Sequence, residues 1–527
     1  MEMNYAAPTA ADASLPTVEE TPQKGLGKAG LVFALFALIA AYLYTCIFPA
    51  GSSPLGFFVL AVSLYAATFV FALIKGARPT VHTLLAVIFG IVMALYYLLN
   101  GESDLYYTVD LFPAFLLSLP CYAYFVVSLF GNHSRSFGGR FILDIAKGVA
   151  YAFMSFIRFF VDIFTFGGEK KGGKKIGLLL LGIAVALIFV LIVGSLLSYD
   201  ANFKKMLPEI NIDTIGETIL KLTFAIPIAA LIYSLFSSSY EKKLPLLSTE
   251  ATAEKVENGM KFLPAVIAVI PAAALLVLYL MFFISQWAYY MSAFTHKLPE
   301  GYSFAEYARE GFFQLCAVAC INGILVAVLR CLTKRRTKAE CVACDVLTIL
   351  LAISTLVLIA TALSKMLLYI DAYDLTRDRL VVTLILVFLA IAFIAVILAA
   401  LIKKMKATPV IIVTAAVFVL VYALCRPGRL IAKYNVDAYL NGKHENIDVM
   451  YLQNEIGYAA VPELLRLYEG TDDSELREKT DDSLDFIATK LRVYRGMEEY
   501  NKWYRMSIPR SQADKLLSDR IEKQLNG

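Results

Sequence analysis

Apolar runs long enough to cross a lipid bilayer recur along this chain, and no other feature constrains its fold so strongly. A membrane-spanning helix needs about 20 apolar residues, because the hydrocarbon layer is roughly 30 Å thick and each helical residue adds about 1.5 Å. Of the 527 residues, 59% are hydrophobic and only 17% are charged, against about 25% charged in soluble domains. The sequence therefore predicts an all-α, polytopic membrane protein.

We predict about eleven transmembrane helices, joined mostly by short links. The links at 49–54 and 75–79 contain proline and glycine, which favour turns. Helices 1–4 fall within 29–130 and helices 5–11 within 176–425. The predicted spans are 29–48, 54–74, 81–99, 111–130, 176–198, 215–237, 262–286, 308–330, 345–369, 380–402 and 408–425.

The two ends of the chain differ from its apolar middle. Residues 1–28 are polar and contain three prolines, so we expect a disordered tail. No short apolar stretch with a small-residue cleavage site opens the chain, so the first apolar run is expected to be an anchor. Residues 426–527 contain 34 of the 92 charged residues, in a pattern of short amphipathic helices. This predicts a C-terminal helical domain with a modest core.

Lysine and arginine are unevenly divided between the two sets of links, which sets the expected orientation. With the N-terminus in the cytoplasm, the inside segments contain 24 of these residues and the outside links contain six. Basic links are typical of the cytoplasmic side of a membrane protein, where they are expected to contact anionic lipids. The domain at 426–527 is then predicted to be extracytoplasmic.

The segment 131–175 raises the question of a twelfth span. Residues 140–166 are apolar enough to cross, but polar residues follow one side of the predicted helix. Such a helix fits the interface plane, so we predict a cytoplasmic amphipathic helix followed by a basic linker. If this segment crossed the membrane, every later basic link would lie on the opposite side. This alternative stays open. The polar stripe consists of Arg140, Asp144, Lys147, Tyr151, Ser155, Arg158 and Asp162.

The densest charge within the apolar part of the chain lies between the ninth and tenth spans. Ionisable groups at a membrane face are expected to pair, to bind a ligand or to anchor a helix end. The candidate outer-face cluster is Glu306, Arg309, Lys365, Asp371, Asp374, Arg377 and Arg379.

Two accounts of this cluster are open. Its members either anchor helix ends among lipid headgroups, or they form a charged outer site or a seat for the C-terminal domain. Lys365, just inside the preceding apolar run, is expected to extend its ammonium group to the outer surface. Asp374 and Arg377 are three positions apart, a pairing distance if the link keeps a helical turn.

No motif predicts a cofactor, a metal or nucleic-acid binding. The segment 168–175 has the glycine and lysine spacing of a phosphate-binding loop, but Lys175 stands where that loop needs serine or threonine. The eight cysteines have no histidine nearby in sequence to complete a zinc site. No catalytic residue is assigned. Asn322, in the middle of the eighth span, is expected to make a hydrogen bond between helices.

Four segments resemble a bacterial family of multi-pass membrane proteins. They are GYSFAEYAREGFFQL at 301–315, YIDAYDLTRDRL at 369–380, the run 431–467, and WYRMSIPRSQADKLL at 503–517. The resemblance covers roughly 110–520. The family is known only as domain of unknown function 4153, with the related 4173, and it implies a protein of the bacterial cytoplasmic membrane without an assigned activity. Asp374 stands where the family more often has the glycine of Tyr-Gly-Leu-Thr.

Two functions from different classes are compatible with these features. The first is a non-enzymatic envelope scaffold or sensor whose outer helical domain binds a protein partner. The second is a transporter or a membrane-embedded enzyme that uses the charged outer-face cluster. We favour the first because the sequence contains no catalytic constellation. A solvated cavity lined by the cluster would favour the second. The sequence does not indicate the oligomeric state.

Overall fold

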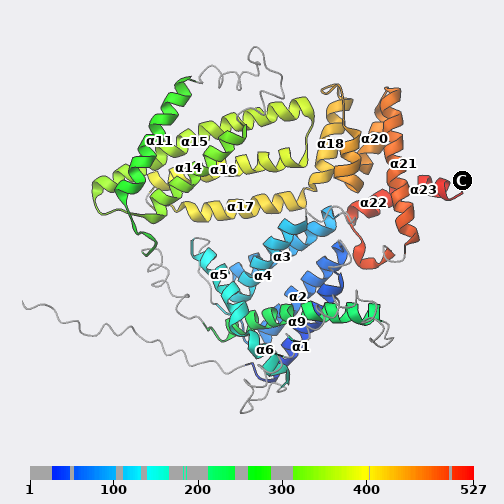
Figure 1. The fold of residues 1–527 in the computed structure, drawn as a ribbon, viewed down its shortest axis with the longest axis horizontal. Helices are drawn as coiled ribbons and strands as arrows, with labels where there is room; N and C mark the ends of the chain where they lie inside the picture. Colours follow the sequence, from blue (N-terminus) through cyan, green and yellow to red (C-terminus); the bar gives the residue numbers. More distant parts are fainter. Residues whose placement is uncertain are drawn as a thin grey trace, which may run out of the picture.

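The computed structural model describes residues 26–47, 53–101, 111–131, 139–164, 212–243, 259–285, 312–402, 404–497 and 501–526, besides the single residues 182 and 186. The prediction of an all-α, polytopic membrane protein is confirmed (Figure 1). The only strands among the described residues are β1 (Leu263–Pro264) and β2 (Thr333–Lys334), which form one short parallel pair.

Nine helices in the described residues are long and apolar enough to cross a membrane. The helix α4 (Leu111–Leu129) coincides with a tenth predicted span. The eleventh, 176–198, lies almost wholly outside the described residues. The nine are α1 (Lys28–Ile47), α2 (Pro54–Ile74), α3 (Val81–Asn100), Leu220–Tyr240 within α9 (Ile212–Tyr240), α11 (Ala265–Ser285), Gln314–Leu332 across α14 (Phe312–Ala327) and η3 (Val328–Leu332), α15 (Lys338–Tyr373), α16 (Arg377–Leu401) and α17 (Ala407–Leu424).

The helix α15 is longer than its predicted span of 345–369. Its 36 residues extend about 54 Å, well beyond a hydrocarbon layer of roughly 30 Å. A capping box starts it, because the Thr337 side chain accepts from the Glu340 amide and the Glu340 carboxylate accepts from the Thr337 amide. The extra turn at its other end carries Asp371 past the apolar run.

The membrane helices form two bundles that touch along α3 and α17 (Figure 1). The first contains α1–α4 and α9, and the second contains α11 and α14–α17. At the shared edge Met93 and Tyr97 of α3 pack near Ala423 of α17. The Asn100 side chain, at the end of α3, donates to the Ala423 carbonyl at 3.2 Å. The C-terminal ends of α3 and α17 therefore lie side by side.

Two shorter helices, α5 (Gly139–Met154) and α6 (Phe156–Phe164), pack against the first bundle. Phe141 of α5 lies 4.6 Å from Tyr124 of α4, measured between ring centroids. The Tyr151 carbonyl accepts from Ser234 of α9 at 2.8 Å. Both contacts fall near the C-terminal ends of α4 and α9, so α5 runs across these two helices. Neither α5 nor α6 is among the candidate spans of the described residues.

The polar stripe of this segment points the opposite way from that of a helix lying on lipid. Such a helix turns its polar side to water, but Asp144, Lys147 and Ser155 are buried, while Ile142 and Phe153 are exposed. Lys147 lies 3.4 Å from Asp144. The stripe therefore supplies buried polar contacts to the first bundle. The cytoplasmic location of the segment stays a prediction.

Asn322 makes the interhelical contact that its sequence position predicts. It is fully buried, and its amide group donates to Thr355 of α15 at 2.9 Å. Its carbonyl oxygen accepts from the Tyr279 hydroxyl of α11 at 2.6 Å. One side chain thus joins α11, α14 and α15, and the predicted hydrogen bond is confirmed.

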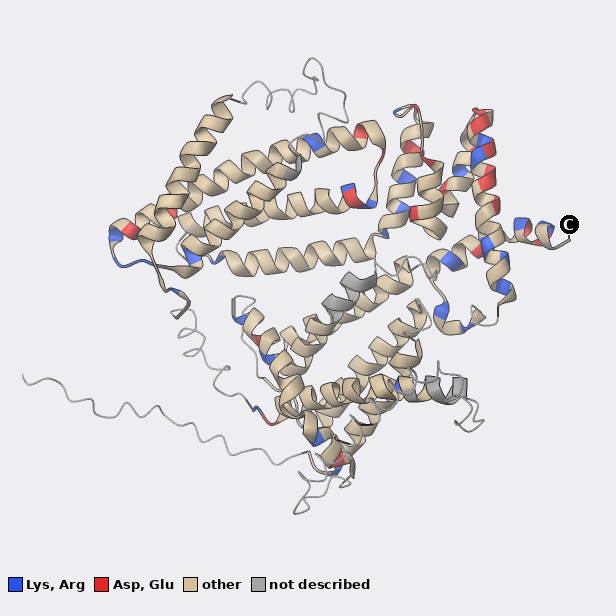
Figure 2. Ribbon diagram, viewed as in Figure 1, with Lys and Arg blue, Asp and Glu red and all other residues tan. Residues whose placement is uncertain are grey.

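The helices after α17 pack together at one end of the membrane helices (Figure 1). Their buried side chains are continuous with the core of the second bundle. Figure 2 shows that Lys, Arg, Asp and Glu are frequent on these helices and sparse along α15, α16 and α17. They are α18 (Pro427–Leu440), α19 (Val449–Tyr451), η4 (Leu452–Ile456), η5 (Gly457–Ala460), α20 (Val461–Gly470), α21 (Ser474–Gly496), η7 (Trp503–Arg505), α22 (Ile508–Leu516) and α23 (Ser518–Asn526).

Replacing Asn322 with leucine should destabilise the second bundle by about 1–3 kcal/mol, because the buried Tyr279 hydroxyl loses its acceptor. The measurement is the thermal unfolding midpoint of the purified protein in detergent. Thr361→Val is the matched control, since the Thr361 hydroxyl donates only within its own helix, to Val357. An Asn322→Leu protein that unfolds no earlier than the control would contradict this role.

Candidate functional site

The link between α15 and α16 lies against α18 and is held there by one buried side chain. Asn435 of α18, 2% exposed, receives the Leu375 amide on its oxygen at 2.8 Å and donates to the Leu375 carbonyl at 3.0 Å. The side-chain amide thus satisfies both polar groups of one residue, as a neighbouring backbone would. Because buried backbone groups are costly to leave unpaired, this contact fixes the link on α18.

Two carboxylates on the membrane side pair with the loop that follows α18. Asp374 lies 2.6 Å from Nδ1 of His444, and both side chains are largely buried. Asp371 lies 2.6 Å from Nζ of Lys443, with both side chains about half exposed. The hydrogen bond that Lys443 donates to Asp371 raises the pKa of Lys443. An exposed pair such as Asp371 and Lys443 contributes only about 0–1 kcal/mol.

Arg377 and Arg379 both make hydrogen bonds at helix ends. The Arg377 amide is the first of α16 and has no intrahelical acceptor. It donates to the Tyr451 hydroxyl at 2.9 Å. The Arg379 guanidinium donates to the carbonyls of Tyr373 and Asp374, at the end of α15. Arg379 therefore caps the C-terminal end of α15. The Tyr451 hydroxyl, from the C-terminal helices, caps the N-terminal end of α16.

We call this contact the docking seat. On the membrane side it consists of Asp371, Asp374, Leu375 and Arg377, and on the C-terminal side of Asn435, Lys443, His444 and Tyr451.

Asp374 adopts a backbone conformation that favours glycine. Its φ is 67°, a region that costs a residue with a side chain of order 1–3 kcal/mol. Aspartate tolerates such angles better than most residues, and here its carboxylate also gains His444. An aspartate can therefore occupy this glycine-like conformation.

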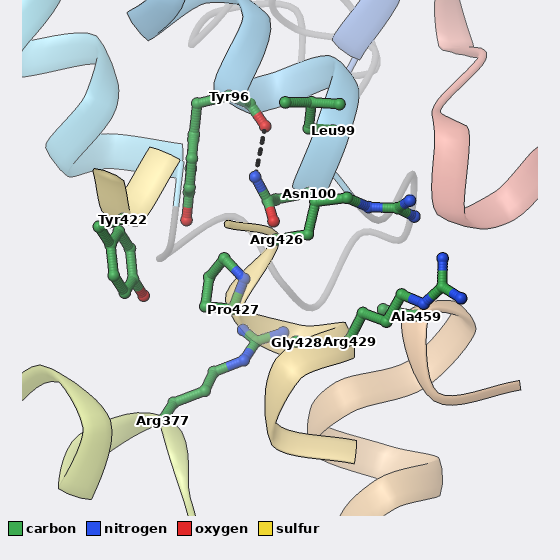
Figure 3. A pocket seen from close by; sticks show the side chains of 10 residues that line it. All are labelled: Tyr96, Leu99, Asn100, Arg377, Tyr422, Arg426, Pro427, Gly428, Arg429 and Ala459. Carbon is green, nitrogen blue, oxygen red and sulfur yellow. Dashed lines mark hydrogen bonds between the residues drawn. The ribbon is translucent and has the colours of Figure 1, made fainter. Parts of the chain in front are cut away.

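A small pocket opens beside the docking seat, at the start of α18 (Figure 3). Its volume is about 360 Å³ including the open space at its mouth. Its walls come from α3, α16, α17, α18 and η5. They are Tyr96, Leu99, Asn100, Arg377, Tyr422, Arg426, Pro427, Gly428, Arg429 and Ala459.

The structure brings together only part of the predicted cluster. Asp371, Asp374 and Arg377 meet the C-terminal helices, whereas Glu306 and Arg309 lie outside the described residues. The expectation that Lys365 extends to the surface is wrong, because its side chain is 1% exposed.

The conditional pairing of Asp374 with Arg377 also differs from the structure. Residues 374–376 are not helical, so the link does not keep the turn that this pairing needs. Asp374 pairs with His444 instead.

Sequence reasoning missed the C-terminal half of the docking seat. The sequence analysis assigns none of Asn435, Lys443, His444 and Tyr451 to a site, although all four lie in the run 431–467 that carries the family resemblance. The link lies in a second such run, 369–380. The two segments in contact are thus two of the four that drew attention to the family.

The described residues contain no group of three or more His, Cys, Asp or Glu side chains that could hold a metal ion. The charged side chains of Asp371, Asp374, Lys443 and His444 are used in hydrogen bonds and ion pairs. The arrangement joins protein segments, and the adjoining pocket offers cationic groups.

The fold and this site define a polytopic α-helical membrane protein whose C-terminal helices are seated on the link between two of its membrane helices. Comparison with family profiles identifies the family of this protein. The chain belongs to the family described as Domain of unknown function (DUF4153), whose profile matches residues 37–467. The match includes the whole docking seat. Comparisons with curated proteins and with solved structures returned no match.

Replacing Asn435 with alanine should open the docking seat, because both Leu375 backbone groups lose their partner. Each loss costs about 1–3 kcal/mol, so cleavage of the C-terminal helices by a protease should accelerate at least tenfold where it follows the open population. Lys433→Ala is the matched control, an exposed neighbour on the same helix. Asp371→Asn should change cleavage only slightly. Equal cleavage of Asn435→Ala and Lys433→Ala would contradict the role given to Asn435.

Proposed function

We propose that this protein is a non-enzymatic envelope scaffold or sensor that holds its C-terminal helices on the outer ends of its membrane helices for an extracytoplasmic protein partner. The docking seat is the observation that carries this proposal. Charges that could have lined a transport or catalytic site are used to attach one part of the protein to another. A scaffold requires its parts to be attached in this way. A transport or catalytic site requires charged groups that stay available to a substrate.

A second contact, to the first bundle, supports this proposal. The Leu55 amide, in the first turn of α2, donates to the Met506 carbonyl at 3.2 Å. A Cβ atom added to the adjacent Gly56 would lie 2.8 Å from Cβ of Tyr504, so the two backbones approach closely. The C-terminal helices therefore touch both bundles, which favours a fixed platform over a loosely tethered domain.

The uneven distribution of lysine and arginine supports the proposed orientation. With 24 of these residues in one set of links and six in the other, we place the N-terminus in the cytoplasm. The C-terminal helices then face the extracytoplasmic side of a bacterial plasma membrane. Anionic lipids are the proposed contacts of the basic cytoplasmic links.

The partner is proposed to bind α21, which lies on the side of the C-terminal helices away from the membrane helices (Figure 1). Glu478, Asp482 and Phe486 follow one another at four-residue spacing and are all exposed, with Phe486 53% exposed. Residues four apart share a helix face. A face with carboxylates beside an exposed aromatic ring suits a protein with a basic and apolar surface.

The alternative function is a transporter or membrane-embedded enzyme that uses the charged outer-face cluster. This would be favoured by a cavity lined by the cluster. Of the cluster residues that the structure describes, only Arg377 lines the pocket at the start of α18. The scaffold proposal therefore has the stronger support.

A photo-crosslinking residue at position 478 should give one discrete protein adduct in intact cells, because that position lies on the proposed partner face. Protease added to spheroplasts should remove a C-terminal tag without lysis. Met450, 57% exposed on another helix of the same region, is the control position and should give no such adduct. Identical patterns at the two positions would refute the partner face, and a tag that survives until lysis would refute the orientation.

A further inference from the structure

The turn at 502–506, between α21 and α22, presents an exposed tryptophan and an exposed methionine. Trp503 is 62% exposed and Met506 is 47% exposed, whereas Arg505 between them is buried. Trp503 and Met506 are three residues apart in a 3₁₀ turn, so they lie on the same side of it. Apolar side chains that are exposed next to one another often mark a surface that contacts a partner or a membrane.

This turn lies against the start of α2, which is a candidate membrane span (Figure 1). The Leu55 amide donates to the Met506 carbonyl at 3.2 Å. A Cβ atom added to Gly56 would lie 2.8 Å from Cβ of Tyr504 and 3.2 Å from Cδ1 of Ile47. Ile47 is the last residue of α1, another candidate span. The turn therefore lies where two membrane spans have their ends.

The side of α2 that faces this turn is exposed along much of the span. Gly56 and Val59 are three residues apart and therefore share that side. Exposed residues then follow at spacings of four, three and four, as they do on one side of a helix. They are Val59, Ser63, Ala66 and Val70. The exposed side of a membrane span faces the acyl chains, so the turn at 502–506 lies over a lipid-facing surface.

Tyrosines at the same level indicate the headgroup region of the membrane. Phe57, in the first turn of α2, packs on Tyr97 of α3, with ring centroids 4.5 Å apart. The neighbouring Tyr96 stacks on Tyr422, near the end of α17. Tryptophan and tyrosine are enriched where membrane helices reach the headgroups, because each ring is apolar and carries one polar group. A tryptophan exposed at this level therefore suits the interface of a bilayer.

We propose that Trp503 and Met506 insert into the headgroup region of the bilayer beside α2 and so anchor the C-terminal helices to the membrane surface. The occupant of this surface is lipid, because the exposed pair continues the lipid-facing side of a membrane span. The docking seat holds the same helices on α15 and α16 through other residues. The anchor depends neither on the proposed protein partner nor on the side of the membrane on which these helices lie.

The test measures the depth of Trp503 by fluorescence of the full chain in lipid nanodiscs. The chain contains two tryptophans, so Trp287→Phe leaves Trp503 as the only one. Its emission is compared in phosphatidylcholine with and without bromine on the upper part of the acyl chains, and with iodide in the water. Brominated lipid should quench the emission by roughly half, because an indole at the headgroup level lies close to the upper acyl chains. Iodide should quench it only weakly.

A tryptophan on α21 is the matched control. Phe486 is also more than half exposed, but α21 lies away from the membrane helices (Figure 1). In the protein with Trp287→Phe, Trp503→Phe and Phe486→Trp, iodide should quench the emission and brominated lipid should not. If Trp287→Phe does not fold, the difference between the wild type and Trp503→Phe gives the emission of Trp503.

Two serine variants test whether the insertion anchors the C-terminal helices. In nanodiscs, Trp503→Ser should speed the cleavage of these helices by a protease several-fold, and Phe486→Ser should not. Equal cleavage of the two variants would overturn the anchoring role. Equal responses of the two tryptophans to brominated lipid would overturn the insertion. Shielding of Trp503 from iodide without quenching by brominated lipid would show that a protein or a second copy covers it, and would overturn the proposal as well.

Discussion

The pair of hydrogen bonds between Asn435 and the backbone of Leu375 is the contact on which the arrangement of this protein depends. The link at 374–376 joins two membrane helices and has no helical partner for its own polar groups. Buried, these groups must be satisfied from elsewhere. Asn435 supplies both partners from α18, so the same two bonds close the link and attach the C-terminal helices. Apolar packing then continues across the junction, from Leu375 into the core around Ile431 and Val436.

The charged residues around that contact differ in burial and in what they bind. The Asp374–His444 pair is sheltered, and Asp374 also has a backbone angle suited to glycine. The Asp371–Lys443 pair is half exposed and contributes little to stability. Arg379 completes the end of α15, and Arg377 turns its side chain to the pocket at the start of α18. These four charges are thus divided among distinct tasks, and no single site uses them all.

The sequence predicted those parts of the fold that depend on apolar length, and it failed where helix rotation matters. Spans such as 54–74 could be placed because a bilayer requires about 20 apolar residues whatever surrounds them. Whether Lys365 faces protein or lipid depends on how α15 is turned among its neighbours, which a single sequence does not encode locally. The same holds for the stripe of α5: its spacing identifies one polar face, but only packing against α4 and α9 shows that this face is buried. Of the docking seat, the charged link was found because charge is rare in apolar surroundings. Asn435 was missed because an asparagine in an amphipathic helix resembles any surface residue.

Hydrogen–deuterium exchange of the wild-type protein, resolved to the amides of the link, tests most directly whether the C-terminal helices are held by this contact. The amides of Leu375 and Arg377 donate to Asn435 and Tyr451, both in the C-terminal helices. If the account is right, these two amides exchange slowly and at the rate of the α18 amides, because the same opening exposes both. Fast exchange at Leu375 and Arg377, with α15 and α18 each still protected, would show that the C-terminal helices are not seated on the link.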